Sequence, residues 1–343
     1  MNITKIETST HENVVKFEDE ESGLEAIIAI HSTTRGPALG GTRFWTYETS
    51  EDLLTDALLL SEAMTYKNAA AELPYGGGKA VINLKNATKT YALLLAYGEA
   101  VEYMNGTYIT AEDVGCAPND LNVISEVTKH CASGKVTSSP ATALGVYTSL
   151  LAALEFNGEF NGESKISDCA VLVQGVGNVG SFLAEILVKA GAEVYVHDID
   201  HDRVQRLMNR LPEVKSIFTK LLLAETKKTI KVFAPCALGP VVTMENKFNM
   251  LDTYDIICGA ANNVVEKGVE ADLTNAGVIY CPDFVTNAGG VISIHHDLIG
   301  TTDQMLVAAD VVKIHTRIHD ILRTSGKSTM EVAYDFAKER LGV

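Results

Sequence analysis

Two lysines that flank a run of three glycines have the residue types and spacing to handle an amine and a carboxylate. Lys67 and Lys79 lie twelve residues apart around Gly76-Gly77-Gly78. Lys67 falls on a predicted helix, and helical spacing places it on the face of the apolar residues Leu60, Ala63 and Met64. A lysine on a buried face needs an anionic partner. The alternative is a lysine whose stem covers apolar surface while its amine reaches water.

Lys79 directly follows the three glycines, which leave room for the close approach of backbone or substrate. The next residues, Ala80-Val81-Ile82, predict a buried strand. Burial disfavours the charged form of a lysine side chain and makes such a side chain competent as a general base. A structural lysine at a turn explains the same motif equally well.

Asp113 is the third candidate for proton chemistry. It follows the predicted strand 107–110 and precedes Gly115, so it belongs to a turn. An acid in this position either exchanges protons with a ligand or simply caps the turn. The local sequence leaves both interpretations open.

A dinucleotide-binding fingerprint begins at Gly175. Gly175, Gly177 and Gly180 fall between a predicted strand and a predicted helix, where they permit a tight turn, the approach of a pyrophosphate and close helix packing. The helix N-terminus offers unpaired N–H groups to the phosphates. Asp198 follows Gly175 by 23 residues and is placed to accept the ribose hydroxyls, so NAD is favoured over NADP. The alternative is a glycine turn that binds another ligand or none.

The elements that must position these residues form two α/β domains. A chain of 343 residues exceeds the size at which one core usually stops growing. We expect a substrate-binding and oligomerisation domain over 1–138 and a Rossmann-type, doubly wound NAD-binding domain over 142–319, with a catalytic cleft between them. The segment 131–140 suits a hinge. A C-terminal helix over about 320–343 is expected to return to the first domain.

The predicted elements follow hydrophobic periodicity. Strands are expected at 14–17, 25–31, 79–83, 107–110, 169–173, 193–196, 231–234, 254–258 and 278–281. Helices are expected at 51–69, 91–104, 119–127, 142–156, 178–190, 302–322 and 329–340. Loops that carry Ala234, Ala260, Asn262 and Asn287 each follow a strand of the second domain, which is where open α/β sheets bind ligands.

Composition excludes several classes of partner. The net charge of −16 disfavours nucleic acid and anionic membranes. No apolar run is long enough for a signal peptide or a membrane span, so we expect a cytoplasmic protein. The six cysteines lack a CxxC pair and are expected to be reduced, and the histidines lack ligand spacing, so no metal is expected.

Six motifs together resemble one enzyme family. They are residues 36–43, 64–68, 76–79, 109–115, 175–180 and 287–290. In this order and spacing they resemble the Glu/Leu/Phe/Val amino-acid dehydrogenases, most closely the leucine dehydrogenases. The resemblance implies reversible oxidative deamination of an L-amino acid to a 2-oxo acid and ammonia, with NAD as the cofactor, by a homo-oligomer that is a dimer or larger.

The resemblance also implies a role for each site residue. Lys67 binds the α-carboxylate, Lys79 is the general base that activates water, and Asp113 shuttles protons to and from the amino nitrogen. The substrate-binding residues it implies are Leu39, Gly40, Met64, Lys67, Ala111, Asn262, Asn287, Val291 and Ile294. The cofactor-binding residues are Thr142, Gly175, Val176, Gly177, Asn178, Val179, Gly180, Asp198, Ala234, Ala260 and Asn262.

The implied side-chain pocket is apolar. Glutamate-specific members of the family place a lysine and a serine where this chain has Leu39 and Ile294, so a buried side-chain carboxylate would lack a partner. Ile294 is one methylene larger than the valine typical of the leucine enzymes, which favours valine or isoleucine. A branched-chain substrate is therefore expected. The alternatives are a phenylalanine- or tryptophan-preferring relative and a non-catalytic NAD-binding regulator.

Overall fold

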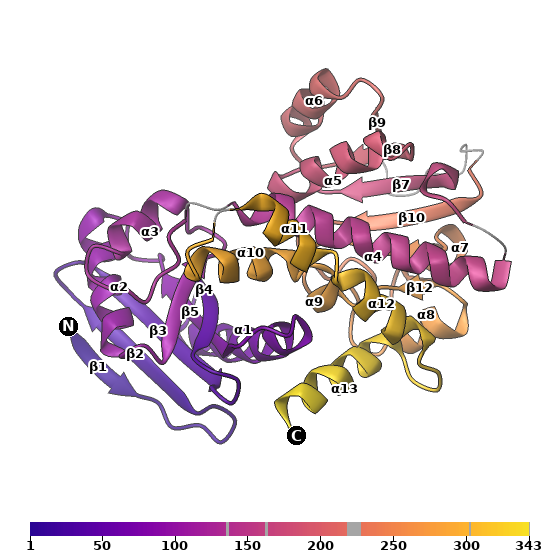
Figure 1. The fold of residues 1–343 in the computed structure, drawn as a ribbon. Helices are drawn as coiled ribbons and strands as arrows, with labels where there is room; N and C mark the ends of the chain where they lie inside the picture. The colour runs from indigo at the N-terminus through magenta and orange to yellow at the C-terminus, as the bar shows by residue number, and fades with distance from the viewer. Residues whose placement is uncertain (135–136, 162–163, 218–227, 302, 343) are drawn as a thin grey trace. The chain divides into compact units, whose positions relative to one another are not determined.

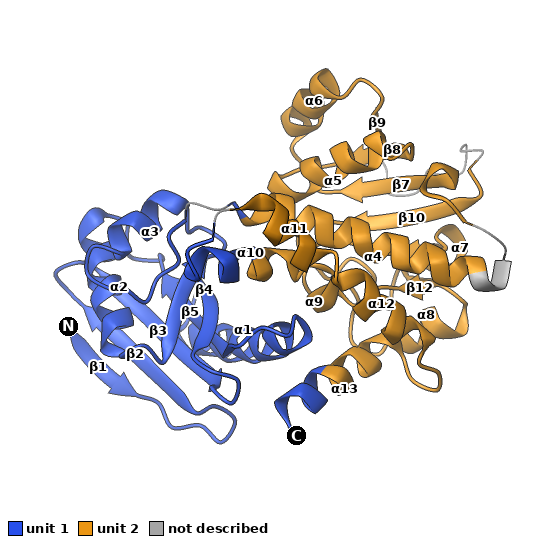
Figure 2. Cartoon of the chain, viewed as in Figure 1, with its two compact units in different colours: residues 1–137, 293–302, 337–343 blue, residues 138–292, 303–336 orange. Residues whose placement is uncertain are grey.

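The computed structural model describes residues 1–134, 137–161, 164–217, 228–301 and 303–342. The chain folds as two compact units (Figure 2): unit 1 contains residues 1–137, 293–302 and 337–343, and unit 2 contains residues 138–292 and 303–336. Helices α10 (Gly289–Leu298) and α13 (Thr329–Leu341) contribute to both units. The predicted two-domain α/β class is confirmed.

Unit 1 is built on a six-stranded mixed sheet with the order β1-β2-β3-β5-β4-β6 (Figure 1). Its strands are β1 (Asn2–Lys5), β2 (Asn13–Asp19), β3 (Leu24–Ser32), β4 (Ala38–Trp45), β5 (Gly76–Asn83) and β6 (Tyr108–Glu112). Strands β1 to β3 and β5 pair antiparallel, while β4 pairs parallel with both β5 and β6. Strand β4 therefore lies between the strands that lead to Lys79 and Asp113. The hydrophobic periodicity of the sequence did not predict this strand.

Helices cover both faces of this sheet. Helix α1 (Ser50–Ala70) packs its Leu53 and Ala57 against one face, where Ile27 and Val81 point. Helices α2 (Tyr91–Tyr103) and α3 (Pro118–Ile124) cover the opposite face. The period-two alternation of the strands explains the division, because neighbouring side chains point to opposite faces. Helix α1 begins with a capping box between Thr49 and Asp52, which fixes its entry next to β4.

Unit 2 contains an all-parallel sheet with the order β12-β11-β10-β7-β8-β9. Its strands are β7 (Cys169–Gln174), β8 (Glu193–His197), β9 (Lys215–Ser216), β10 (Ile230–Pro235), β11 (Ile256–Ile257) and β12 (Ile279–Tyr280). The chain order reverses between β7 and β10, which is the point where doubly wound sheets bind ligands. Strand β7 is fully buried, as expected of a parallel strand with both faces covered.

The helices of unit 2 follow its strands in the doubly wound pattern (Figure 1). They are α4 (Ser138–Asn161), α5 (Asn178–Lys189), α6 (His201–Arg210), α7 (Lys247–Thr253), α8 (Glu270–Asn275), α9 (Asp283–Thr286), α11 (Gln304–Val311) and α12 (Ile314–Arg323), with a short 3₁₀ turn, η1 (Ile166–Asp168). Among the residues that the structure describes, no helix is long and apolar enough to span a bilayer.

One predicted helix is wrong. The segment 302–322 forms two helices, α11 and α12, that are separated by a turn at Val312 and Lys313. Residue 302 itself lies outside the described residues. The turn contains neither glycine nor proline, so nothing in the local sequence marks it.

Candidate active site

The sheet of unit 1 brings Lys79 and Asp113 into contact. The side chain of Lys79 is 6% exposed, and its Nζ lies 2.7 Å from Oδ2 of Asp113. The two residues belong to segments on either side of β4, which carries Gly40 and Gly41 at this point. A Cβ on Gly40 would lie 1.7 Å from the carbonyl oxygen of Gly78, and one on Gly41 would lie 2.8 Å from Cβ of Asp113. The glycines of β4 thus permit the close approach of the neighbouring segments.

Asp113 is held ionised by two cations. Burial alone would raise the pKa of its carboxyl group, but the charges of Lys79 and Arg43 lower it below its ordinary value. Nε of Arg43 lies 3.3 Å from the same Oδ2 that contacts Lys79. A carboxylate hydrogen-bonded to a lysine amine can exchange a proton with it or with a ligand beside it.

Lys67 lies on the last turn of α1 and is half-buried. The expectation that it shares a buried face with Leu60, Ala63 and Met64 is wrong, because Ala63 is exposed and the other two are half-buried. The buried stripe of α1 instead consists of Leu53, Ala57, Ser61, Thr65 and Asn68, with Ala69 and Ala70 at its end. Its polar members pack against glycines: a Cβ on Gly77 would lie 2.1 Å from the backbone nitrogen of Thr65. Hydrophobicity alone could not identify a buried face that is polar.

Asn68 links α1 by hydrogen bonds to the two strands beside it. Its Nδ2 donates to the carbonyl oxygens of Leu39 on β4 (3.2 Å) and Gly76 on β5 (2.6 Å). Leu39 and Ala111 are each 1% exposed. Two of the side chains proposed for an apolar substrate pocket, those of Leu39 and Ala111, are therefore buried in the sheet of unit 1.

The predicted substrate-binding residues are distributed between the two units. Leu39, Gly40, Met64, Lys67, Ala111 and Ile294 belong to unit 1, whereas Asn262, Asn287 and Val291 belong to unit 2. Ile294 is half-buried and Val291 is buried.

Sequence reasoning missed a contact next to Ile294. The hydroxyl of Tyr75, which directly precedes β5, lies 3.0 Å from Nδ1 of His295 on α10. The two rings are 5.5 Å apart and meet edge to face. The contact ties the segment before the triple glycine to α10. No motif signals it, because the residues are 220 positions apart.

In unit 2 the predicted fingerprint forms a strand–turn–helix. Gly175 follows β7 with a φ of +91°, and Gly177 is the N-cap residue of α5. A Cβ on Gly180 would lie 1.9 Å from the carbonyl oxygen of Gly175, so only glycine allows the helix to pack this closely. Asp198 follows β8, and its Oδ2 accepts the backbone N–H of Val176 at 2.8 Å. The carboxylate is thereby fixed beside the glycine turn.

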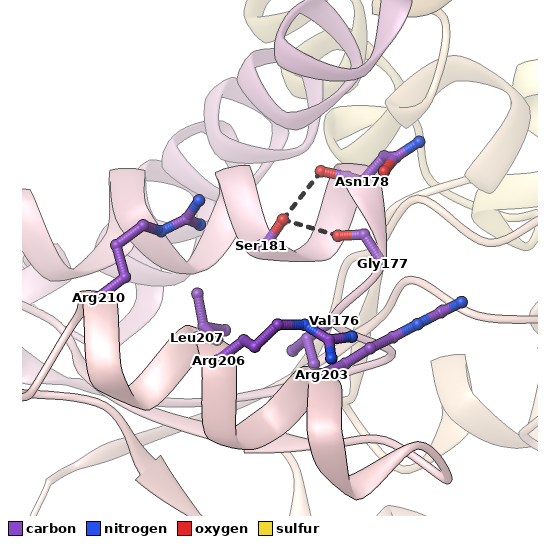
Figure 3. Close-up of a pocket in the computed structure, with 8 residues that line it drawn as sticks. All are labelled: Val176, Gly177, Asn178, Ser181, Arg203, Arg206, Leu207 and Arg210. Carbon is purple, nitrogen blue, oxygen red and sulfur yellow. Dashed lines mark hydrogen bonds between the residues drawn. The ribbon is translucent and has the colours of Figure 1, made fainter.

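A hollow of about 450 Å³ opens beside this turn (Figure 3). It is lined by Val176, Gly177, Asn178, Ser181, Arg203, Arg206, Leu207 and Arg210. The three arginines come from α6, and Arg203 pairs with Asp200 at 3.1 Å, where both side chains are exposed. The Ser181 hydroxyl donates to the carbonyl oxygens of Gly177 (2.7 Å) and Asn178 (3.2 Å). Backbone N–H groups, a helix N-terminus and arginines suit a ligand with phosphate groups.

Two further cofactor candidates of unit 2, Ala260 and Asn262, lie beside the substrate-binding candidate Asn287. Nδ2 of Asn287 donates to Oδ1 of Asn262 (2.8 Å) and to the carbonyl oxygen of Ala260 (3.1 Å). Asn287 is 6% exposed, and within the described part of the chain its Oδ1 has no hydrogen-bond partner. A buried acceptor of this kind suits an amide or ammonium donor of a ligand.

The start of α4 lies beside the start of α10. Thr142 is 9% exposed, and its Oγ1 would lie 2.7 Å from a Cβ on Gly290. The other candidates are more scattered: Val179 is half-buried on α5, and Ala234 is buried near the end of β10. The donors and acceptors of unit 2 fit a dinucleotide.

Comparisons with known proteins identify the family. Residues 11–130 match the model of the Glu/Leu/Phe/Val dehydrogenase dimerisation domain, and residues 134–341 match that of the Glutamate/Leucine/Phenylalanine/Valine dehydrogenases. The chain belongs to the Glu/Leu/Phe/Val dehydrogenase family. The resemblance predicted from the sequence is confirmed, and the chain is an amino-acid dehydrogenase by family.

Relatives within the Glu/Leu/Phe/Val dehydrogenase family act on different amino acids. The chain is 41% identical to a valine dehydrogenase of Streptomyces albus over 84% of its length and 80% of the relative. It is 38% identical to a leucine dehydrogenase of Bacillus cereus over 98% and 92% of the two chains. The crystal structure of the L-tryptophan dehydrogenase from Nostoc punctiforme is similar at a TM-score of 0.81 and 35% identity, covering 97% and 96%. Family membership therefore leaves the preferred substrate open.

Proposed function

We propose that the protein catalyses the reversible, NAD-dependent oxidative deamination of a branched-chain L-amino acid to its 2-oxo acid and ammonia. The observation that carries the proposal is the 2.7 Å contact between Lys79 and Asp113, which couples a buried amine to a partly buried carboxylate. A protein that only sensed NAD would not need this pair. The Lys79–Asp113 contact therefore argues against the alternative of a non-catalytic NAD-binding regulator.

Lys67, Asp113 and Lys79 have separate tasks in the proposed reaction. Lys67 binds the α-carboxylate of the substrate. Asp113 accepts a proton from the α-ammonium group, which frees the nitrogen lone pair. NAD, when bound, accepts the hydride from the α-carbon. Lys79 then takes a proton from the water whose oxygen bonds to the imino carbon, and it releases this proton to solvent. Asp113 returns its proton to the nitrogen, the C–N bond breaks, and Lys79 accepts the proton of the new hydroxyl group as the carbonyl forms and ammonia leaves.

NAD is the proposed cofactor because of Asp198. Its carboxylate is 9% exposed and is fixed beside the glycine turn through the N–H of Val176. A fixed anion in this position accepts ribose hydroxyls and repels a 2′-phosphate. Arg203 and Arg206 line the nearby hollow, where their positive charges would attract a 2′-phosphate. The relative affinity for NAD and NADP therefore tests whether Asp198 or the arginines dominate.

The proposed substrate class depends on Leu39 and Ala111. Both side chains are 1% exposed, and a glutamate side chain beside them would lose its hydration without gaining a partner. A second candidate is an aromatic amino acid, which the similarity to the L-tryptophan dehydrogenase over 97% of this chain favours. The bulk of Ile294 on α10 is the feature that favours the branched-chain substrate.

A substrate panel tests the proposal. The purified protein is mixed with NAD and single L-amino acids at alkaline pH, and NADH absorbance is followed. We expect the aliphatic branched-chain substrates to react fastest. Faster turnover of tryptophan or phenylalanine would establish the second candidate, and no turnover with any amino acid would overturn the enzyme proposal.

We also propose a homo-oligomer in the cytoplasm. The match of residues 11–130 to a dimerisation domain supports the oligomer. Light scattering coupled to size-exclusion chromatography would test it, and a monomer at all concentrations would contradict it.

A further inference from the structure

Arg43 contacts two carboxylates of unit 1. It lies on β4, between the strands that lead to Lys79 and Asp113. Its Nε is 3.3 Å from Oδ2 of Asp113, and its Nη1 is 3.1 Å from Oδ2 of Asp56 on α1. A guanidinium group makes such a bridge well because its donors are fixed in one plane.

The second carboxylate is itself held in place. The hydroxyl of Tyr47 donates to Oδ2 of Asp56 at 2.5 Å, and the backbone N–H of Tyr47 donates to Oδ1 of Asn83 at 3.1 Å. Asn83 is on β5, four residues after Lys79. The polar contacts therefore run in a closed ring from β5 through Asp113, Arg43, Asp56 and Tyr47 back to β5.

The two cations on Asp113 differ in one respect. A lysine amine can lose its proton, and the proposed reaction requires Lys79 to do so in each cycle. An arginine stays charged at any working pH. When Lys79 is neutral, Arg43 is the cation that still compensates the partly buried carboxylate of Asp113.

We infer that Arg43 is a positioning residue that fixes the Asp113 carboxylate against Lys79 and keeps it ionised while Lys79 is neutral. The inference deepens the proposed function and rests on it. Arg43 touches neither substrate nor water in this account. Its effect is transmitted through Asp113.

The direction of the pH effect follows from the charges. Asp113 must be deprotonated in the free enzyme to accept the substrate proton. The acid limb of kcat/KM reports proton uptake by the contacting Lys79–Asp113 pair as a unit. The positive charge of Arg43 lowers the pKa of Asp113 and disfavours that uptake, so the loss of Arg43 moves the acid limb to higher pH.

The other groups around Asp113 do not replace Arg43. Lys79 faces it from β5, while Asp56 and Tyr47 lie one contact further away, behind Arg43. Cys116 on the following turn is buried, and burial raises the pKa of its thiol, so it stays neutral. Asp120 at the start of α3 is paired with Lys89 at 2.6 Å.

The test compares three variants. Arg43→Gln removes the charge, Arg43→Lys retains it, and Lys89→Gln is the matched control. Lys89 is a suitable control because its Nζ contacts Gly115 on the same turn, at 2.8 Å from the carbonyl oxygen, and pairs with Asp120 rather than Asp113. NAD affinity and circular dichroism check that each variant folds.

We expect the acid limb of kcat/KM to rise by about 1 pH unit in Arg43→Gln, as one opposite charge within contact distance predicts. Its kcat should fall by about tenfold, since the carboxylate is no longer held from both sides. In Arg43→Lys the acid limb should return most of the way to its wild-type pH, and in Lys89→Gln it should not move. A folded Arg43→Gln variant with an unmoved limb would overturn the inference, as would an equal shift in Lys89→Gln.

A second measurement keeps this inference separate from the proposed function. Carboxyl carbons of ¹³C-aspartate-labelled protein are titrated without substrate, and the Asp113 signal is assigned by its loss in Asp113→Asn. The Asp113 midpoint should lie higher in Arg43→Gln than in the wild type. Absence of turnover in the wild type would refute the proposed function, whereas an unchanged midpoint would refute the role of Arg43.

Discussion

The two units build their sites by different physical means. Unit 1 gathers buried charges from separate strands, with Lys79 and Arg43 sharing one oxygen of Asp113. Unit 2 shapes its site with backbone: a glycine turn, a helix N-terminus and one carboxylate that accepts the N–H of Val176. The removal of a charge should therefore abolish chemistry in unit 1. The addition of a methyl group should impair binding in unit 2.

The largest effect is expected from Lys79→Ala. Without the amine the attacking water has no base, and turnover should fall by roughly 10²–10⁴-fold. Affinity for NAD should be unchanged, because the proposed dinucleotide contacts lie in unit 2. Steady-state rates and calorimetric titration with NAD measure the two quantities, and activity within about tenfold of the wild type would contradict the assignment of the base.

Gly180→Ala should have the complementary effect. The new Cβ would collide with the carbonyl oxygen of Gly175, so α5 must move away from the turn. We expect NAD to bind at least about tenfold more weakly, because a displaced helix N-terminus no longer meets the phosphates. The control is Glu185→Ala, further along α5, because Glu185 does not line the hollow and pairs with Lys189 instead. Equal NAD affinity in the Gly180→Ala variant and the wild type would refute the backbone account of unit 2.

Asp198→Asn tests which charge governs the choice of cofactor. The amide keeps the shape of the carboxylate but loses its negative charge, and Arg203 and Arg206 line the hollow nearby. The ratio of kcat/KM for NADP to that for NAD should rise by about tenfold, a change of about 1.4 kcal/mol in relative binding. Adding Arg206→Gln should reverse the gain. A ratio that does not change would show that Asp198 does not discriminate.

The smallest effect is expected from Ile294→Val. One methylene in an apolar pocket contributes about 1–3 kcal/mol to discrimination. The smaller side chain should raise the rate with leucine relative to valine, at the low end of that range because Ile294 is half-buried. Competition between the two substrates in one assay measures the ratio. An unchanged ratio would place Ile294 outside the side-chain pocket, and a shift toward valine would contradict its role in limiting side-chain size.

The same contrast explains what the sequence could predict. The fingerprint of unit 2 spans Gly175 to Gly180, a single turn, so its residues are neighbours in both sequence and space. The ring around Arg43 joins residues from β4, α1, β5 and the turn after β6. Such a ring has no local sequence signature. Arg43 is the last residue of the motif 36–43, and the motif alone assigns it no role.

Strand β4 illustrates the limit most clearly. Its Gly40-Gly41 pair resembles a turn, so no strand was predicted there. The structure places this pair in the interior of the sheet. Only glycine fits there, because a Cβ on Gly40 would collide with the carbonyl oxygen of Gly78, and a Cβ on Gly41 would collide with that of Glu112. The demand for glycine comes from packing across strands, which periodicity along one segment does not encode.

The most direct test of the central claim follows the hydrogen on the α-carbon of the substrate. The protein is incubated with L-valine deuterated at that carbon and with NAD, and the NADH is analysed by mass spectrometry. The account predicts NADH that carries one deuterium and the appearance of equimolar 2-oxo acid and ammonia. Absence of NADH from every branched-chain substrate, or NADH without the label, would contradict hydride transfer from the α-carbon.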